Sequence, residues 1–424
     1  MCYNKRKKEE FMNTHYVPRL VLKKFSDRIC TYNIKTGELK ENIKTEDAYS
    51  KTDFYDSETE DNFNRKVESQ FGNLLANKLL KCEGVVELSR KELRLTKKFL
   101  LLSVLRSVGN KEFLQVERKF YDNLKEKWKA FAKLNGLSEQ ETLSALESER
   151  MKAPFDEKVI EGETDYQYWM RTLNVILDTD GTPEEILKHP NKTYPAHRWA
   201  TIISNGYLAF WDTDSKNDEF VITDIGMTSE NEKGWNGITT HNTKKTDFYL
   251  NLLKNEKDKN LQMLILKFMN MNANFHENFQ MFPISKNRMI VEIAPFYKFR
   301  ATYSYIYKMP DLRYLTCLPN EDLFSPNTVR YVKQQPLDGL SYDYDDNDKY
   351  IYEIKKLNKE EIRYCNALFM DRINTYLGFS SLDKAVGSII KYKKLNDFPY
   401  VPRVDYTNLY KIIEERYCGS LNTK

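Results

Sequence analysis

The chain has 424 residues and a net charge of +4, from 66 basic and 62 acidic side chains. Proteins that coat duplex DNA carry a larger and more clustered cationic excess, so the charge permits nucleic acid as a partner without demanding it. The six cysteines lack zinc-ligand spacing, and we see neither a membrane-length apolar stretch nor a signal peptide, which predicts a cytoplasmic protein with no membrane partner.

The first half of the chain is predicted to be a helical layer with a small β element in front of it. Apolar residues at helical spacing predict a helix over 16–25. Two short strands follow over 29–33 and 38–43, joined by a turn that contains Gly37. Further helices are expected over 61–81, 90–108, 112–134, 138–150 and 164–178.

Beyond residue 195 the pattern changes to short strands separated by polar turns. Paired strands are predicted over 207–211 and 220–223, and a hairpin over 278–282 and 288–293. The remaining expected elements are a helix or strand over 198–204, strands over 331–333 and 349–355, and helices over 244–271 and 359–377.

Together these elements predict an α+β fold that is predominantly helical. It would have a helical N-terminal layer with a small β element, and a C-terminal half with short antiparallel strands. Since no Gly, Ser or Pro linker divides the chain, we expect one large domain over 12–424 after a disordered extension over 1–11. A helical sub-domain over 56–195 and a mixed one over 196–424 are the finer alternative.

The segment His15-Tyr-Val-Pro18, with Leu22 and Phe25, resembles the opening signature of a bacterial family known only as domain of unknown function 4238. Later landmarks occur in the family's order: Asp53-Phe-Tyr55, Glu68, Arg106, Phe220-Val-Ile-Thr-Asp224, Phe282-Pro-Ile-Ser285, and 357–362 with Asn366. The resemblance spans roughly 12–377. It implies no particular reaction, and the family's phage-linked distribution implies a role in anti-phage defence or as a toxin.

His15 is the first candidate catalytic residue. It precedes Pro18 at the expected start of a helix, where free backbone N–H groups can bind an anion, and an imidazole there could act as general acid or base. The structural alternative is a helix-capping or packing role, with the Tyr16 ring buried. In the catalytic interpretation Tyr16 and Arg19 bind substrate.

Asp224 and Arg106 are the other two candidate catalytic residues. Asp224 follows an apolar strand, where a carboxylate could orient His15 or hold a divalent metal; the alternative is a turn in which it accepts backbone N–H bonds. Arg106 ends an apolar helix and, if buried, must pair with a carboxylate or a phosphate. In the structural interpretation Arg106 pairs with Glu68 on the neighbouring helix. In the catalytic interpretation Glu68 binds substrate.

A separate constellation offers an alternative metal site. Asp338 precedes a strand that carries Glu353 and Lys355 on one face, an order that resembles the PD-(D/E)xK nuclease core, in which Asp and Glu hold Mg²⁺. Mg²⁺ is therefore the cofactor that this alternative predicts. No GxGxxG, P-loop or GxSxG motif is present, which disfavours dinucleotide dehydrogenases, P-loop NTPases and α/β-hydrolases.

These residues predict a nuclease-like effector that acts on RNA or DNA. His15 would move the proton, Arg106 would neutralise the phosphate, and Asp224 would orient His15 or a metal. The alternative is a non-catalytic binding module that recognises nucleic acid or a phage protein. Convergence of the three residues on one pocket would favour the enzyme, and separate structural partners for each would favour the binding module.

Overall fold

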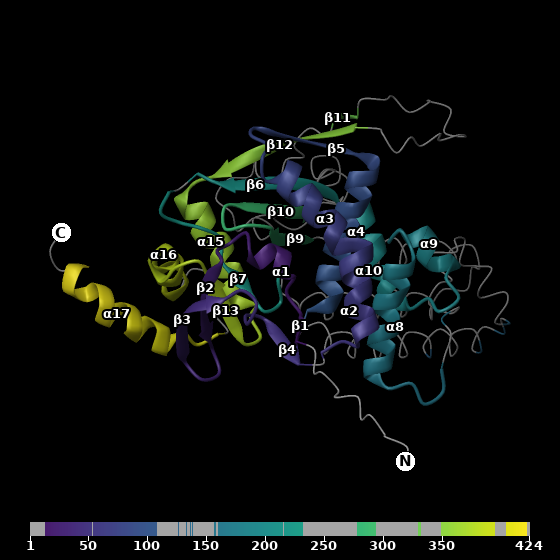
Figure 1. Cartoon of the computed structure of the whole chain (residues 1–424), viewed down its shortest axis with the longest axis horizontal. Helices are drawn as coiled ribbons and strands as arrows, with labels where there is room; N and C mark the ends of the chain where they lie inside the picture. Colours follow the sequence, from purple (N-terminus) through teal and green to yellow (C-terminus); the bar gives the residue numbers. More distant parts are fainter. Residues whose placement is uncertain are drawn as a thin grey trace, which may run out of the picture.

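The computed structural model describes residues 13–52, 54–107, 126, 133, 136, 138, 157, 160–214, 216–231, 278–293, 330–331, 349–394 and 404–421. Within these ranges the chain forms three sheets, of seven, four and two strands, and helices pack on both faces of the largest (Figure 1).

The seven-stranded sheet is mixed. Its strands are β5 (Val85–Ser89), β6 (Tyr207–Thr213), β8 (Thr228–Asn231), β9 (Asn278–Pro283), β10 (Arg288–Ile293), β11 (Arg330–Tyr331) and β12 (Lys349–Leu357). Their order is β11-β12-β6-β10-β9-β8, and β5 also pairs with β12. β12 runs parallel to β6, whereas the other pairs are antiparallel. The predicted hairpin over 278–293 is confirmed as β9 and β10.

The two smaller sheets are antiparallel. One has the order β3-β2-β13-β7, from β3 (Glu38–Lys44), β2 (Arg28–Asn33), β13 (Tyr376–Phe379) and β7 (Ile222–Thr223). The other pairs β1 (Asn13–His15) with β4 (Ser50–Thr52). The predicted hairpin around Gly37 is confirmed as β2 and β3, and Gly37 has the positive φ of 71° that this turn requires.

The helices form two groups on either side of the seven-stranded sheet. The first group is α1 (Arg19–Leu22), α2 (Ser57–Phe63), η1 (Asn64–Glu68), α3 (Ser69–Leu74), η2 (Leu75–Leu79), α4 (Arg90–Arg106), α8 (Asp165–Asp178), α9 (Pro183–Lys188) and α10 (Tyr194–Asn205). The second is α15 (Lys359–Asp371), α16 (Leu382–Lys393) and α17 (Thr407–Leu421). From α2 to η2 the chain is one continuous helix in which η1 and η2 are π-helical.

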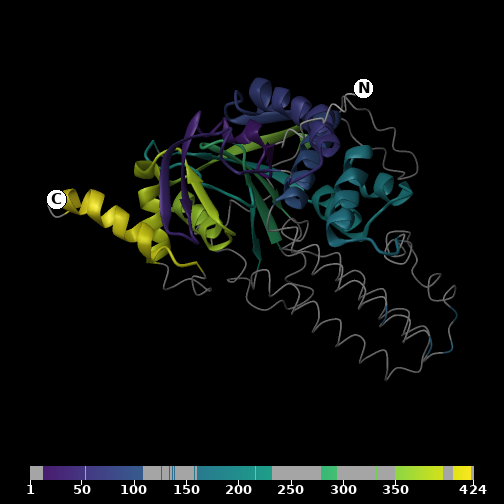
Figure 2. The same ribbon diagram turned by 60° about the horizontal axis from the view of Figure 1, so that its bottom comes forward.

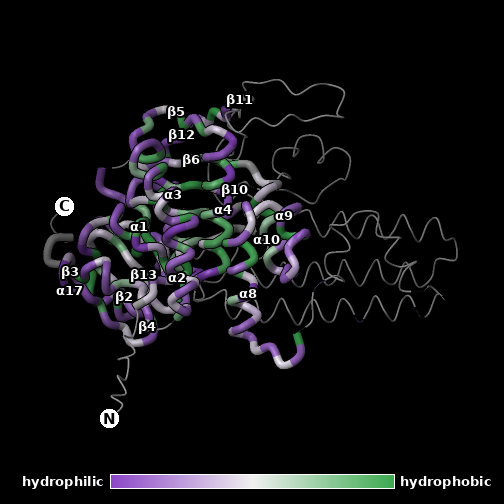
Figure 3. Tube along the Cα trace, turned by 45° about the vertical axis from the view of Figure 1, so that its right-hand side comes forward, coloured by the Kyte–Doolittle hydropathy of each residue, from purple (hydrophilic) through white to green (hydrophobic). Residues whose placement is uncertain are grey.

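Strand alternation divides the core in two. Leu208 and Phe210 of β6 point into a cluster shared with α4, α8 and α10, whereas Ala209 and Trp211 point into a cluster shared with α15 and α16. Turned by 60°, the molecule shows α17 extending away from the rest of the described chain (Figure 2). Hydrophobic stretches gather along α4 and β10, and β3 at the margin is hydrophilic (Figure 3).

The expectation of a predominantly helical fold with only short strands is wrong. The fold is α+β, but its centre is the seven-stranded mixed sheet. Sequence periodicity missed β5 and the parallel β12–β6 pair, because pairing between strands distant in sequence leaves no local signal.

Three predicted elements differ in detail. The strands predicted to pair over 207–211 and 220–223 lie in different sheets, since β7 pairs with β13. The predicted helix over 359–377 ends at Asp371, and the chain then forms the strand β13 of the four-stranded sheet. A Cβ at Gly378 of β13 would lie 2.2 Å from the Tyr49 hydroxyl oxygen, so glycine permits this close packing. The predicted helix over 16–25 is the single turn α1.

Several expectations fall on other parts of the chain. The helices predicted over 112–134, 138–150 and 244–271, and the extension over 1–11, lie almost entirely outside the described residues.

The N-terminus of α4 provides a test of this fold. The Ser89 hydroxyl accepts a hydrogen bond from the Glu92 N–H at 3.2 Å, and the Glu92 carboxylate accepts one from the Ser89 N–H at 2.7 Å. Ser89→Ala should therefore lower the free energy of unfolding, measured by urea denaturation, by about 1 kcal/mol. Ser69→Ala, at an exposed position inside the long helix, is the matched control and should cause no loss. Equal losses in both variants would contradict this capping role.

Candidate functional site

The His15-Tyr-Val-Pro18 segment lies between a strand and a single helical turn. His15 ends β1 and is paired with Ser50 of β4, and the Tyr16 N–H donates to the Tyr49 carbonyl at 3.1 Å. Pro18 has φ −55° and ψ 124°, so the chain is still extended when it reaches α1. Proline cannot donate to a strand ladder, which ends the pairing of β1 here.

The imidazole of His15 is half-buried and has a defined tautomer. Its Nε2 lies 3.0 Å from the carbonyl oxygen of Glu46. A carbonyl can only accept, so Nε2 carries the hydrogen and the lone pair of neutral His15 is on Nδ1. Burial lowers the pKa of His15, and the charges of Arg106 and Arg19 lower it further, against the opposing effect of the bond to Glu46. His15 is therefore a neutral base at pH 7.

Arg106 fixes the position of this histidine. The guanidinium is only 2% exposed, forms an ion pair with Glu68 and donates a hydrogen bond to the main-chain carbonyl of His15. It also lies 4.5 Å from the centre of the Phe63 ring. The pairing of Arg106 with Glu68 that the sequence offered as the structural alternative is present, so Arg106 contacts the backbone of His15 and a carboxylate.

The π-helical segment η1 sets the direction of Glu68. In a regular α-helix, residues eight positions apart point about 80° away from each other. In a π-helix each turn contains about one residue more, so the side-chain direction rotates less per residue. Glu60 and Glu68 therefore point toward nearly the same face of the helix. The charge of Arg106 acts on Glu60 as well, although burial dominates and raises the pKa of Glu60. Two carboxyl groups thus surround one buried guanidinium.

Asp224 lies on the other side of the segment. It follows β7, is 1% exposed, and accepts a hydrogen bond from the Asn374 N–H at 3.1 Å. Burial raises its pKa to about 6, against the effect of backbone N–H groups of Asn374, Tyr376 and Thr375. The carboxylate thus accepts backbone N–H bonds, as in the structural alternative, but from the distant segment 374–376 and not only within a local turn.

Tyr16 separates Asp224 from His15. The ring is 6% exposed, and burial together with the charge of Asp224 raises the pKa of its hydroxyl. The structure thus brings His15 and Arg106 together, and places Asp224 beside Tyr16.

The two remaining candidate substrate-binding residues differ in exposure. Arg19 is 41% exposed along its side chain and pairs with Glu46, next to the carbonyl that binds His15. Glu68 is 12% exposed and occupied by Arg106. Among the predicted substrate-binding residues, Arg19 is thus the one that a ligand could reach.

The alternative metal site is only partly described. Asp338 lies outside the described residues, and Glu353 is exposed on β12 while Lys355 is half-buried. In the part of the chain that the structure covers, no group of three or more His, Cys, Asp or Glu side chains is arranged to hold a metal ion.

Sequence reasoning missed a buried polar cluster in the large sheet. Glu292 and Gln280 face each other on β10 and β9, are fully buried, and have side-chain oxygen and nitrogen atoms without a hydrogen-bond partner. The Lys97 amine lies nearby and donates to the carbonyls of Ser204 and Gly206 at 2.8 and 2.7 Å. Burial raises the pKa of Glu292 and lowers that of Lys97. A glutamate within the otherwise apolar run Met289–Ile293 was the available signal.

A family model described as a protein of unknown function, DUF4238, matches residues 13–381. The chain belongs to the DUF4238 family. The family predicted from the sequence is thereby confirmed, and the DUF4238 region ends one residue before α16 begins. No curated protein and no solved structure matches this DUF4238 chain significantly. Over the described residues, none of its helices is both long and apolar enough to cross a bilayer.

The ion pair of Arg106 gives a stability prediction. Glu68→Gln leaves a buried guanidinium without its paired charge, so the free energy of unfolding should fall by about 3 kcal/mol. Glu46→Gln removes the partner of the exposed Arg19 and should cost less than about 1 kcal/mol. Urea denaturation of both variants measures the difference. Similar small losses would show that Arg106 is not held by this pair.

Asp224 gives a pH prediction. Its pKa in the folded chain is about 6 instead of 3.8, so the folded state binds more protons between these pH values. Its contribution to the free energy of unfolding therefore declines as the pH rises from about 4 to 6, by about 3 kcal/mol in total. Asp224→Asn should remove this decline, so the variant gains stability relative to wild type across the window. A pH profile unaltered by Asp224→Asn would refute the assignment.

Proposed function

We propose that this DUF4238 protein is a nuclease-like effector that cleaves phosphodiester bonds with His15 as general base. The observation that supports it most is the His15 tautomer. With Nε2–H bound to the Glu46 carbonyl, Nδ1 presents a lone pair that no described residue occupies. The lowered pKa keeps that nitrogen unprotonated near pH 7, which is what a general base requires.

In the proposed reaction, the phosphate lies between His15 and Arg19. Nδ1 of His15 takes the proton of the attacking hydroxyl, a new P–O bond forms, the P–O bond to the leaving oxygen breaks, and that oxygen takes up a proton from water. Arg19 neutralises charge on the phosphate because its guanidinium is partly exposed. RNA suits a single base well, since its 2′-hydroxyl supplies the nucleophile within the substrate. Arg106 is a positioning residue that holds the main chain of His15.

A second candidate function is a non-catalytic binding module that recognises nucleic acid or a phage protein. It is favoured because two of the three predicted catalytic side chains already have partners within the protein. The Arg106 guanidinium is paired with Glu68, and the Asp224 carboxylate accepts backbone N–H bonds. Under either function we place the protein in the bacterial cytoplasm, in anti-phage defence or a toxin system.

Purified wild type, His15→Ala, Arg19→Gln and Arg28→Gln should be incubated with RNA and plasmid DNA, with Mg²⁺ or with EDTA. We expect wild type to cleave RNA, with kcat/KM rising with pH up to the lowered pKa of His15. His15→Ala should lose at least about 100-fold. Arg19→Gln should also lose activity, whereas exposed Arg28→Gln is the control and should not.

Each other outcome has a defined meaning. Nucleic acid bound but never cleaved by wild type would contradict the nuclease and support the binding module. Cleavage that EDTA abolishes would place a metal in the reaction. Cleavage that survives in a folded His15→Ala protein would exclude His15 as the base.

A further inference from the structure

A cavity of about 360 Å³ lies on the outward face of α8, separate from the residues of the His15 site. Its lining includes Gln167, Arg171, Asn174 and Asp178, which follow one stripe of this helix at helical spacing. His189 and Asn191, from the loop between α9 and α10, form the facing side. The cavity is thus built by a helix face and a loop.

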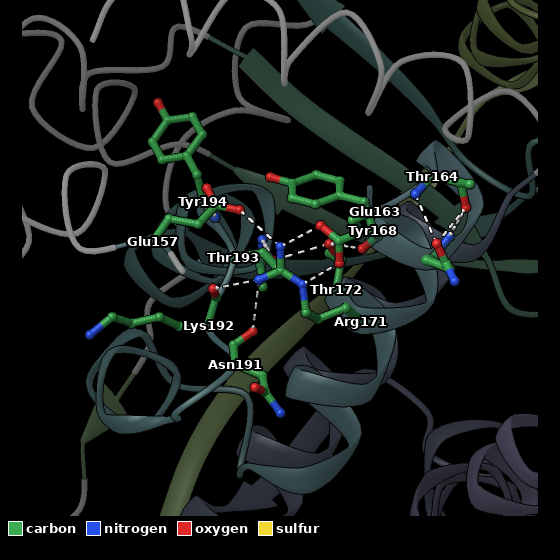
Figure 4. Close-up of polar contacts among 12 residues, drawn as sticks. Glu157, Glu163, Thr164, Tyr168, Arg171, Thr172, Asn191, Lys192, Thr193 and Tyr194 are labelled. Carbon is green, nitrogen blue, oxygen red and sulfur yellow. Dashed lines mark hydrogen bonds and ion pairs between the residues drawn. The ribbon is translucent and has the colours of Figure 1, made fainter. Parts of the chain in front are cut away.

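Arg171 holds that loop against the helix (Figure 4). Its guanidinium donates to the carbonyls of Asn191 and Lys192 at 3.4 and 3.2 Å, and to the Glu163 carboxylate at 2.7 and 2.8 Å. Glu157 lies 3.6 Å away as a second counter-charge. Arg171 is therefore a fixed part of the wall, and its charge is neutralised.

The charges that remain at the cavity disfavour an anionic ligand. Asp56 and Asp178 are both exposed, and Asp178 pairs with Lys66 at 2.6 Å and lies 4.0 Å from His189. Because Lys66 and Arg171 already have acidic partners, a phosphate would be repelled by the carboxylates of Asp56 and Asp178. A neutral ligand fits this balance better.

Three side chains at the cavity have hydrogen-bonding capacity to spare. Within the described residues, the amides of Asn174 and Asn191 make no side-chain hydrogen bond. Nδ1 of His189 accepts from the Asn191 N–H at 3.2 Å, so in the neutral ring Nε2 carries the hydrogen. Nε2 lies 4.0 Å from Asp178. The helix and the loop thus both offer hydrogen-bonding groups to the cavity.

Apolar side chains of α8 flank its polar stripe. Met170 is 6% and Val175 1% exposed, and they lie on opposite edges of the stripe. At one end, Tyr166 is 37% exposed, and it is one of two large hydrophobic side chains with such exposure among the described residues. A flat ring can stack on such a surface.

We propose that this cavity binds an uncharged nucleoside. The base would lie over Tyr166 and Met170, with its polar edge at the amides of Asn174 and Asn191. The ribose hydroxyls would donate to Asp178. The volume is at the lower end of the range for small-molecule pockets, about 300–1,000 Å³, and so suits one nucleoside. The inference goes beyond the proposed function and does not depend on cleavage by His15.

Binding should be measured by isothermal titration calorimetry on the full chain, with adenosine, guanosine, cytidine and uridine. Their 5′-monophosphates, free ribose and glucose are the comparison ligands. At least one nucleoside should bind, its monophosphate more weakly because of Asp56 and Asp178, and ribose and glucose not at all.

Two variants and one control locate the site. Asn174→Leu keeps the volume but removes the amide, and should weaken nucleoside binding at least about 5-fold. Asp178→Asn should reduce the ratio of the Kd for the monophosphate to the Kd for the nucleoside. Glu185→Gln removes an exposed carboxylate outside the cavity and should change neither the Kd for the nucleoside nor this ratio. The proposal is overturned if no nucleoside binds, if a folded Asn174→Leu binds normally, or if glucose or ribose binds equally well.

Discussion

The buried ion pair of Arg106 and Glu68 connects three parts of the chain that are distant in sequence. The guanidinium ends α4, the carboxylate belongs to the π-helical turn η1, and a second guanidinium nitrogen donates to the main-chain carbonyl of His15. Removing one partner of a buried charge is costly, so each partner constrains the others. The end of β1, and with it the candidate site, is thus held by this ion pair as well as by the pairing with β4.

Alternation along an extended chain explains why adjacent residues serve different surroundings. His15 faces the two arginines, and Tyr16 faces Asp224 and the aromatic rings around Tyr49. Successive side chains of a strand point in opposite directions. The segment therefore separates a basic environment, which lowers the pKa of a histidine, from an apolar one, which raises the pKa of a carboxyl group.

Local features were predictable from the sequence and distant ones were not. The two hairpins carried turn residues and apolar runs, and the pairing of Arg106 with Glu68 followed from two neighbouring amphipathic helices. The π-helical phase and the partners of Asp224 could not be predicted, because Asn374 lies far along the chain and its N–H has no side-chain signature. The cavity on α8 was missed because its polar residues have the spacing of an ordinary exposed helix face. Glu292 was missed because one charged residue hardly alters the pattern of an apolar strand.

The order of strands in the largest sheet also affects synthesis. Within the described residues β5 pairs with β12 alone, and more than half of the chain is translated between them. A nascent polypeptide therefore leaves the ribosome with this edge unpaired for most of its elongation, when strand edges promote aggregation. The β5–β12 pair can therefore form only late in synthesis, once residues 349–357 have emerged.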